Sequence, residues 1–185
     1  MVAMDTEHNG QRVALVAGAT RGAGRAIAVE LARAGLHVYA TGRSSPAAGR
    51  SEIGWPETIE ETGDLIAAVG GGTALVVDHE DPAAVAGLVA QIAAEHGRLD
   101  VLVNDIFGGD RYAQWHTPMW EHDLAGGLRM LRMGVDTHLV TAHAALPLLL
   151  RGDRGLLVEM TDGTAEVNAS YREGVASSTT WSRRT

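Results

Sequence analysis

Three glycines near the start of the chain have the spacing of a loop that binds phosphate. Gly18, Gly22 and Gly24 follow the apolar run at 13–17 and lead into a helical pattern. Gly18 lets the chain turn sharply off a strand, Gly22 lets the backbone approach an anion, and Gly24 lets a helix lie tightly against a sheet. The free N–H groups and the positive dipole end of such a helix suit a pyrophosphate. The competing interpretation is an ordinary strand–turn–helix with flexible glycines.

Two arginines indicate which nucleotide such a loop would take. Arg43 follows the second apolar run in Thr41-Gly42-Arg43, and Arg21 lies inside the glycine loop. A dinucleotide fold that takes NAD places an acid after this strand, where it binds the ribose 2′-hydroxyl and would repel a phosphate. Two guanidiniums and no carboxylate suit a 2′-phosphate, which arginine holds bidentately. We therefore predict NADP(H), against the alternative that Arg43 is a solvated loop residue.

Alternating strand and helix patterns must hold these residues in place. The strand patterns lie at 13–17, 37–40, 73–77, 99–103 and 155–160. The helical patterns lie at 22–34, 58–69, 82–96 and 119–150, with a break expected near Gly126-Gly127. Such alternation favours parallel strands with right-handed crossovers. It predicts an α/β fold, a doubly wound parallel (Rossmann) sheet whose ligand lies at the carboxyl ends of the strands.

Composition limits the partners and the compartment. The 185 residues are 45% apolar, enough for one domain with a core. A net charge of −8 argues against nucleic acid or an anionic membrane as the main partner. The absence of cysteine excludes disulfides and thiolate metal sites and fits a cytoplasmic location. No apolar run reaches membrane-spanning length.

With these pieces placed, the chain resembles the short-chain dehydrogenase/reductase superfamily over residues 12–168. The resemblance rests on the three glycines, on Asp78 after the third strand and on Asn104 after the fourth. It implies that the cofactor site consists of Gly18, Thr20, Arg21, Gly22, Gly24, Arg43, Asp78 and Asn104. In it, Asp78 would approach the adenine and Asn104 would line the adenine pocket; plain polarity at strand ends is the alternative. The resemblance also implies hydride transfer between nicotinamide and a small-molecule carbonyl or alcohol.

The chain departs from the family at each catalytic position. Asp136 stands at the family's asparagine, and the family's serine position falls on Thr161-Asp162. The nearest tyrosine is Tyr171, and Val175 stands where the family has a lysine four residues later. All 15 basic residues are arginine, so the family's Tyr-x-x-x-Lys pair cannot exist in this polypeptide. The catalytic candidates are Thr161, which could instead only cap a loop, and Asp136.

These departures leave more than one function open. The first hypothesis is an NADP-dependent oxidoreductase with impaired activity, and the second is a non-catalytic NADP-binding regulatory module. A metal hydrolase is a third alternative, suggested by histidines such as His138 and His143. Because a separation of five residues places them about 140° apart around a helix, they do not pair as ligands, and we predict no metal site.

The end of the chain lacks the expected pattern. From residue 176 onward neither apolar period is present. Possible codons for residues 175–185, read in a shifted frame, permit Phe-Tyr-Asp-Leu-Val-Lys, although coincidence is the alternative. We expect one NADP-binding domain at 1–168, incomplete at its C-terminal edge, and an irregular, out-of-frame tail at 169–185. The fifth strand would then be an unprotected edge, and the apolar helix before it would promote self-association.

Overall fold

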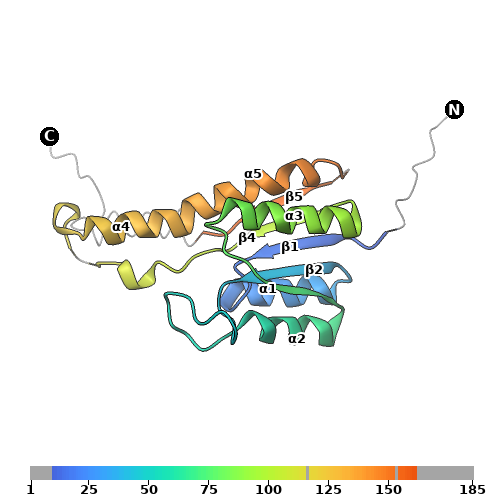
Figure 1. The fold of residues 1–185 in the computed structure, drawn as a ribbon, viewed down its shortest axis with the longest axis horizontal. Coiled ribbons are helices and arrows are strands. Elements are labelled where there is room, and N and C mark those ends of the chain that lie inside the picture. The colour runs from blue at the N-terminus through green and yellow to red at the C-terminus, as the bar shows by residue number, and fades with distance from the viewer. Residues whose placement is uncertain (1–9, 116, 153, 162–185) are drawn as a thin grey trace, which may run out of the picture.

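Five parallel strands form one sheet through the middle of the molecule (Figure 1). The computed structural model describes residues 10–115, 117–152 and 154–161. The strand order is β3-β2-β1-β4-β5, and every neighbouring pair is parallel. The strands are β1 (Val13–Ala17), β2 (His37–Gly42), β3 (Gly72–Val76), β4 (Val101–Asn104) and β5 (Leu156–Glu159). This arrangement confirms the predicted doubly wound sheet.

Helices cover both faces of this sheet, as Figure 1 shows. The helices are α1 (Gly22–Arg33), α2 (Ile59–Val69), α3 (Pro82–His96), α4 (Leu124–Leu131) and α5 (Thr137–Leu149). Short 3₁₀ turns lie at Asp110–Tyr112 and Met119–Glu121, between β4 and α4. As the Asp81-Pro82 pair indicates, α3 begins with Asp81 as N-cap, whose carboxylate accepts from the Ala83 N–H at 2.9 Å.

Strand β1 divides the core into two layers. All five of its residues are buried, as expected for a strand covered on both faces. Val13 and Leu15 belong to the layer under α3 and α5, whereas Ala14 and Val16 belong to the layer under α1 and α2. Since side chains alternate along a strand, one continuous apolar run supplies both layers.

The sheet and helices differ from the sequence-based expectations in their details. Strand β2 continues through Thr41 and Gly42, two residues beyond the strand pattern at 37–40. The Gly126-Gly127 pair lies inside α4 and does not break it. Asp123 caps this helix by accepting from the N–H groups of Ala125 and Gly126, which stabilises its first turn despite the glycines.

The long helical region turns its apolar stripe away from the sheet. A π-helical turn at Arg132–Asp136 joins α4 to α5. The face that packs inward consists of Met133, Thr137, Thr141, Ala145, Leu148 and Leu149. Large apolar residues on the outward side are Leu124, Leu128, Leu131, Val135 and Leu139, each 47–72% exposed. No helix within the described ranges combines the length and hydropathy that a membrane crossing requires.

Candidate cofactor site

A cavity of about 280 Å³ opens at the carboxyl ends of the strands, where the fold class places its ligands. Six of the eight predicted cofactor residues line it: Gly18, Thr20, Arg21, Gly22, Arg43 and Asp78. Gly24 and Asn104 do not line it. A larger hollow between α3 and α5 is lined mainly by apolar side chains and lacks this convergence of polar groups.

The glycine loop is shaped by close backbone contacts. Gly18 has a φ of +89°, and a Cβ there would lie 2.3 Å from the Asp105 carbonyl oxygen. A Cβ on Gly24 would lie 2.5 Å from the Gly18 carbonyl oxygen, so α1 reaches the loop only because this residue lacks a side chain. The N-cap of α1 is Arg21, which makes no side-chain capping bond. The first turn of α1 therefore receives no N-cap side chain and presents its dipole to the cavity.

Close packing also explains why a glycine stands at position 42, at the end of β2. A Cβ on Gly42 would lie 1.9 Å from the Thr20 hydroxyl oxygen, so the buried Thr20 side chain would have to move. The Gly18 and Ala19 N–H groups donate to the Thr41 carbonyl at 3.0 and 2.8 Å. The end of β2 thus holds the glycine loop, and the next residue along, Arg43, enters the same cavity.

Arg21 carries a buried donor with no acceptor. Its Nη1 makes no hydrogen bond in the described part of the chain, and Nη2 donates to Ser51 Oγ at 3.5 Å. The guanidinium lies 5.3 Å from the ring centroid of Trp55. Burial lowers the pKa of Arg21, because the charged form loses its hydration. A phosphate oxygen would supply the acceptor that this guanidinium lacks.

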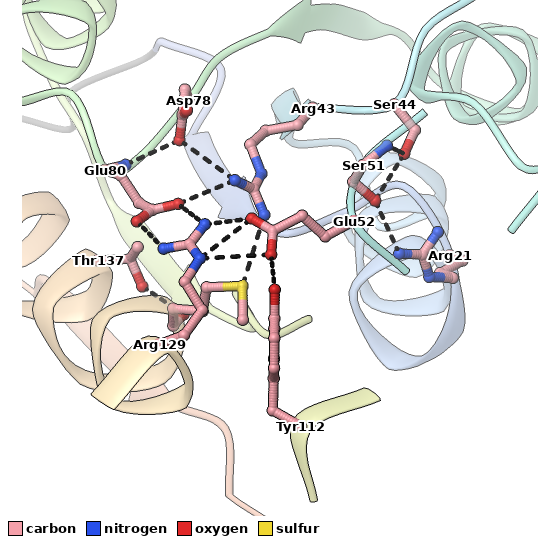
Figure 2. A network of polar contacts seen from close by, with 11 residues as sticks. Arg21, Arg43, Ser44, Ser51, Glu52, Asp78, Glu80, Tyr112, Arg129 and Thr137 are labelled. Carbon is pink, nitrogen blue, oxygen red and sulfur yellow. Dashed lines mark hydrogen bonds and ion pairs between the residues drawn. The ribbon is translucent and has the colours of Figure 1, made fainter. Parts of the chain in front are cut away.

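The surroundings of Arg43 correct one sequence-based expectation. No carboxylate stands next to Arg43 in the Thr41-Gly42-Arg43 segment, but the structure brings two from the loop after β3. Arg43 Nη1 donates to Glu80 at 2.9 Å and lies 3.9 Å from Asp78 (Figure 2). These carboxylates are distant in sequence, and only the parallel pairing of β2 with β3 places the two strand ends together.

Arg129 of α4 extends this group into a chain of ion pairs, shown in Figure 2. Its two terminal nitrogens donate to Glu80, and its Nε donates to Glu52 at 3.1 Å. Tyr112 also donates to Glu52, at 2.6 Å. The hydrogen bonds from Arg129 and Tyr112 lower the pKa of Glu52 to about 2, and the bond from Arg129 lowers the pKa of Glu80. Both carboxylates are therefore charged at neutral pH.

Asp105 places a carboxylate against the glycine loop. It follows β4, lines the cavity and accepts a hydrogen bond from the Gly24 N–H. Burial raises the pKa of Asp105, the hydrogen bond from Gly24 opposing that shift. An anion bound at the start of α1 would share this environment with Asp105.

Asn104 is buried beneath the cavity wall. Its amide nitrogen donates to Glu159 Oε1 at 2.7 Å, and its Oδ1 has no hydrogen-bond partner among the described residues. Glu159 also contacts His138 Nδ1 at 2.6 Å, and His138 Nε2 lies 3.0 Å from the Ile106 carbonyl oxygen. This network joins the ends of β4 and β5 to α5.

The two catalytic candidates lie outside the cavity wall. Asp136 is exposed in the π-helical turn, and Thr161 is exposed just after β5. Neither lines the cavity. Tyr171, Val175, the domain boundary at 168 and the 169–185 tail lie outside the described residues. In the described residues, no group of three or more histidine or acidic side chains is arranged to hold a metal ion.

The family model for short chain dehydrogenases matches residues 12–175. The chain belongs to this family. It is 37% identical over 132 residues to human dehydrogenase/reductase SDR family member 1, covering 65% of this chain and 38% of that protein. It is 32% identical over 175 residues to an uncharacterized NAD-dependent oxidoreductase of Mycobacterium tuberculosis, covering 89% of this chain and 62% of that protein. The chain therefore spans between two fifths and three fifths of the length of these relatives.

A solved member of similar fold contains a cofactor. The structure described as the Pseudomonas aeruginosa RhlG/NADP active-site complex is 26% identical, with a TM-score of 0.59. The match covers 76% of this chain and 48% of that one.

Sequence reasoning did not single out four charged residues in and around this cavity, Glu52, Glu80, Asp105 and Arg129. Glu80 follows Asp78 by two residues at a strand end, a local signal that could have identified it. Asp105, next to Asn104, gives a similar signal. Glu52 and Arg129 give no such local signal, because these two residues pair with each other across 77 positions of the sequence.

Proposed function

We propose that this chain binds NADP(H) in the cavity at the carboxyl ends of β1 and β2. The observation that carries the proposal is the pair of guanidiniums, Arg21 and Arg43, in one cavity beside the start of α1. Within the described residues, Arg21 Nη1 is buried without an acceptor, which supports an anionic ligand.

The proposed arrangement follows the direction of the chain. The start of α1, with Gly18, Thr20, Gly22 and Gly24, takes the diphosphate, and Arg21 and Arg43 take the 2′-phosphate. In this arrangement Asp78 approaches the adenine, and Asn104 lies behind the cavity wall on the same side. The RhlG complex supports NADP, whereas the name of the mycobacterial relative refers to NAD.

The proposed reaction is hydride transfer with a small-molecule carbonyl or alcohol. Bound nicotinamide would supply or accept the hydride. We propose Thr161 as the hydroxyl that orients the substrate oxygen and Asp136 as the polar group of the helix. The family's tyrosine–lysine pair has no counterpart in a chain without lysine, so the expected activity is impaired.

A non-catalytic NADP-binding regulatory module is the second candidate, and the lack of lysine favours it. We also propose a cytoplasmic location, which the absence of cysteine supports. Sustained NADPH oxidation with a panel of carbonyl compounds would select the enzyme. Tight NADPH binding without turnover in the same preparation would select the module.

Removing either guanidinium tests the binding proposal. We expect Arg21→Gln and Arg43→Gln each to raise the Kd for NADPH about tenfold, since each loses a charge-assisted bond to phosphate. The measurement is NADPH fluorescence titration of the full chain.

Arg33→Gln is the matched control, because Arg33 pairs with Glu30 on exposed helix surface. It should leave the Kd unchanged. An absence of NADPH binding by the unaltered chain, or equal effects of all three substitutions, would reject the proposed site.

A further inference from the structure

The guanidinium of Arg43 is already occupied by a carboxylate of the chain itself. Its Nη1 donates to Glu80 Oε2 at 2.9 Å, and the two side chains are 27% and 24% exposed. Because both are largely shielded, water screens this pair less than an ion pair on an open surface. A phosphate that reaches Arg43 therefore meets a negative group already bound to one of the two terminal nitrogens of the guanidinium (Figure 2).

Glu80 has a second partner that does not depend on Arg43. Arg129 donates to both carboxylate oxygens of Glu80, with Nη2 to Oε2 at 2.6 Å. Arg129 is held in place by Glu52, which accepts from its Nε at 3.1 Å. If a phosphate takes Arg43, Glu80 stays paired with Arg129, so the exchange leaves no carboxylate without a partner.

The two coenzymes differ at this one point. NADH carries a ribose 2′-hydroxyl and leaves the Arg43–Glu80 pair in place, whereas the 2′-phosphate of NADPH must compete with Glu80. We propose that Glu80 sets the preference between NADPH and NADH by competing with the 2′-phosphate for Arg43. This inference rests on the proposed NADP(H) site. The charge of Glu80 lowers affinity for NADPH and has little effect on affinity for NADH.

Neutralising Glu80 tests this role directly. Glu80→Gln preserves the size of the side chain and one oxygen that can accept from Arg129, and it removes the charge together with the second acceptor oxygen. We expect the Kd for NADPH to fall about fivefold and the Kd for NADH to change less than twofold. Glu30→Gln, an equal change of net charge on the exposed surface of α1, should leave the ratio of the two Kd values unchanged.

Arg129→Gln supplies a second variant with the opposite expectation. It deprives Glu80 of its other partner and leaves the carboxylate to Arg43 alone. The Kd for NADPH should then rise about fivefold relative to that for NADH, which tests the inference even if Glu80→Gln does not fold. Circular dichroism of each variant establishes folding before titration.

The outcomes separate this inference from the function on which it rests. If the unaltered chain binds neither coenzyme, the NADP(H) site is rejected and the role of Glu80 with it. If the unaltered chain binds NADPH but neither variant changes the ratio of Kd values, only the role of Glu80 is rejected. Equal tightening of both coenzymes by Glu80→Gln would also reject it, because that result shows a general charge effect.

Discussion

At the scale of single residues, Asp105 places a carboxylate beside the glycine loop, where an anion is expected to bind. Its carboxylate accepts from the Gly24 N–H and lies in the cavity wall. When charged it repels a diphosphate, and it occupies one of the N–H groups at the start of α1. The Asp105 carboxylate thus helps to hold the glycine loop in place and also weakens the binding of a diphosphate there.

Replacing Asp105 with asparagine should strengthen cofactor binding. Asp105→Asn keeps an oxygen acceptor for Gly24 and removes the charge, so we expect the Kd for NADP⁺ at pH 7.5 to fall about fivefold. Because the pKa of Asp105 is raised by burial, lowering the pH protonates it sooner than an ordinary aspartate. Affinity of the unaltered chain should therefore rise relative to the variant as pH falls, which calorimetric titration from pH 5 to 8 would measure.

The 2′-phosphate itself titrates near pH 6 and changes the Kd of both proteins. The effect of Asp105 is therefore measured by the ratio of the Kd of the unaltered chain to that of the variant. Weaker binding of NADP⁺ by the variant than by the unaltered chain at pH 7.5 would contradict this role for Asp105.

At the scale of elements, a buried histidine connects the sheet to the helix above it. His79 is 3% exposed and lies 2.8 Å from the hydroxyl of Thr41 on β2 and 2.7 Å from that of Thr141 on α5. Thr141 donates to the Thr137 carbonyl at 2.7 Å, so it accepts from His79 Nδ1, and His79 Nε2 accepts from Thr41. Burial away from water favours the neutral form of this imidazole.

This connection should fail in acid. Burial lowers the pKa of His79 to about 4, from an ordinary value of 6.5, so the unfolded chain binds a proton more readily than the folded one. Stability is thus unaffected by this group above pH 6.5 and decreases as the pH falls toward 4, by about 3 kcal/mol in all.

Urea unfolding at several pH values would measure the decrease. His79→Gln, which cannot titrate in this range, should lose less stability than the unaltered chain between pH 6.5 and 4. Parallel pH profiles for the two proteins would show that His79 does not cause the loss.

At the scale of the whole molecule, the outward stripe of α4 and α5 favours association. Leu128, Leu131 and Leu139 are 48%, 56% and 65% exposed on one continuous helical region. The chain covers 38% and 62% of the two curated relatives compared above. We keep self-association through this stripe as a prediction.

Polar substitutions on the stripe should reduce association. We expect the unaltered chain to sediment as dimers or larger species at tens of micromolar, and Leu128→Gln combined with Leu131→Gln to shift it toward the monomer. Leu65→Gln, at a 45% exposed leucine on α2, is the control and should leave the sedimentation profile unchanged. A monomeric unaltered chain at all concentrations would contradict the prediction.

The sequence by itself determined the order of the elements and the doubly wound sheet, and it singled out six of the residues that line the cavity. These features depend on local patterns, since the apolar run of β1, the glycines and the Asp81 cap each act within a few residues. The presence of Arg21 and Arg43 in the cavity has the same local cause, because both lie within four residues of the end of a strand.

Only the tertiary structure decided what surrounds those arginines and which side of the long helix faces water. Glu80 and Arg129 meet across 49 residues, and Glu52 and Arg129 across 77, because parallel strands and the helix between them end at one edge of the sheet. Likewise, which face of the region from α4 to α5 is buried, including the π-helical turn between them, can be determined only from the folded structure. Charge balance and burial arise from neighbours in space, and the local sequence pattern does not contain them.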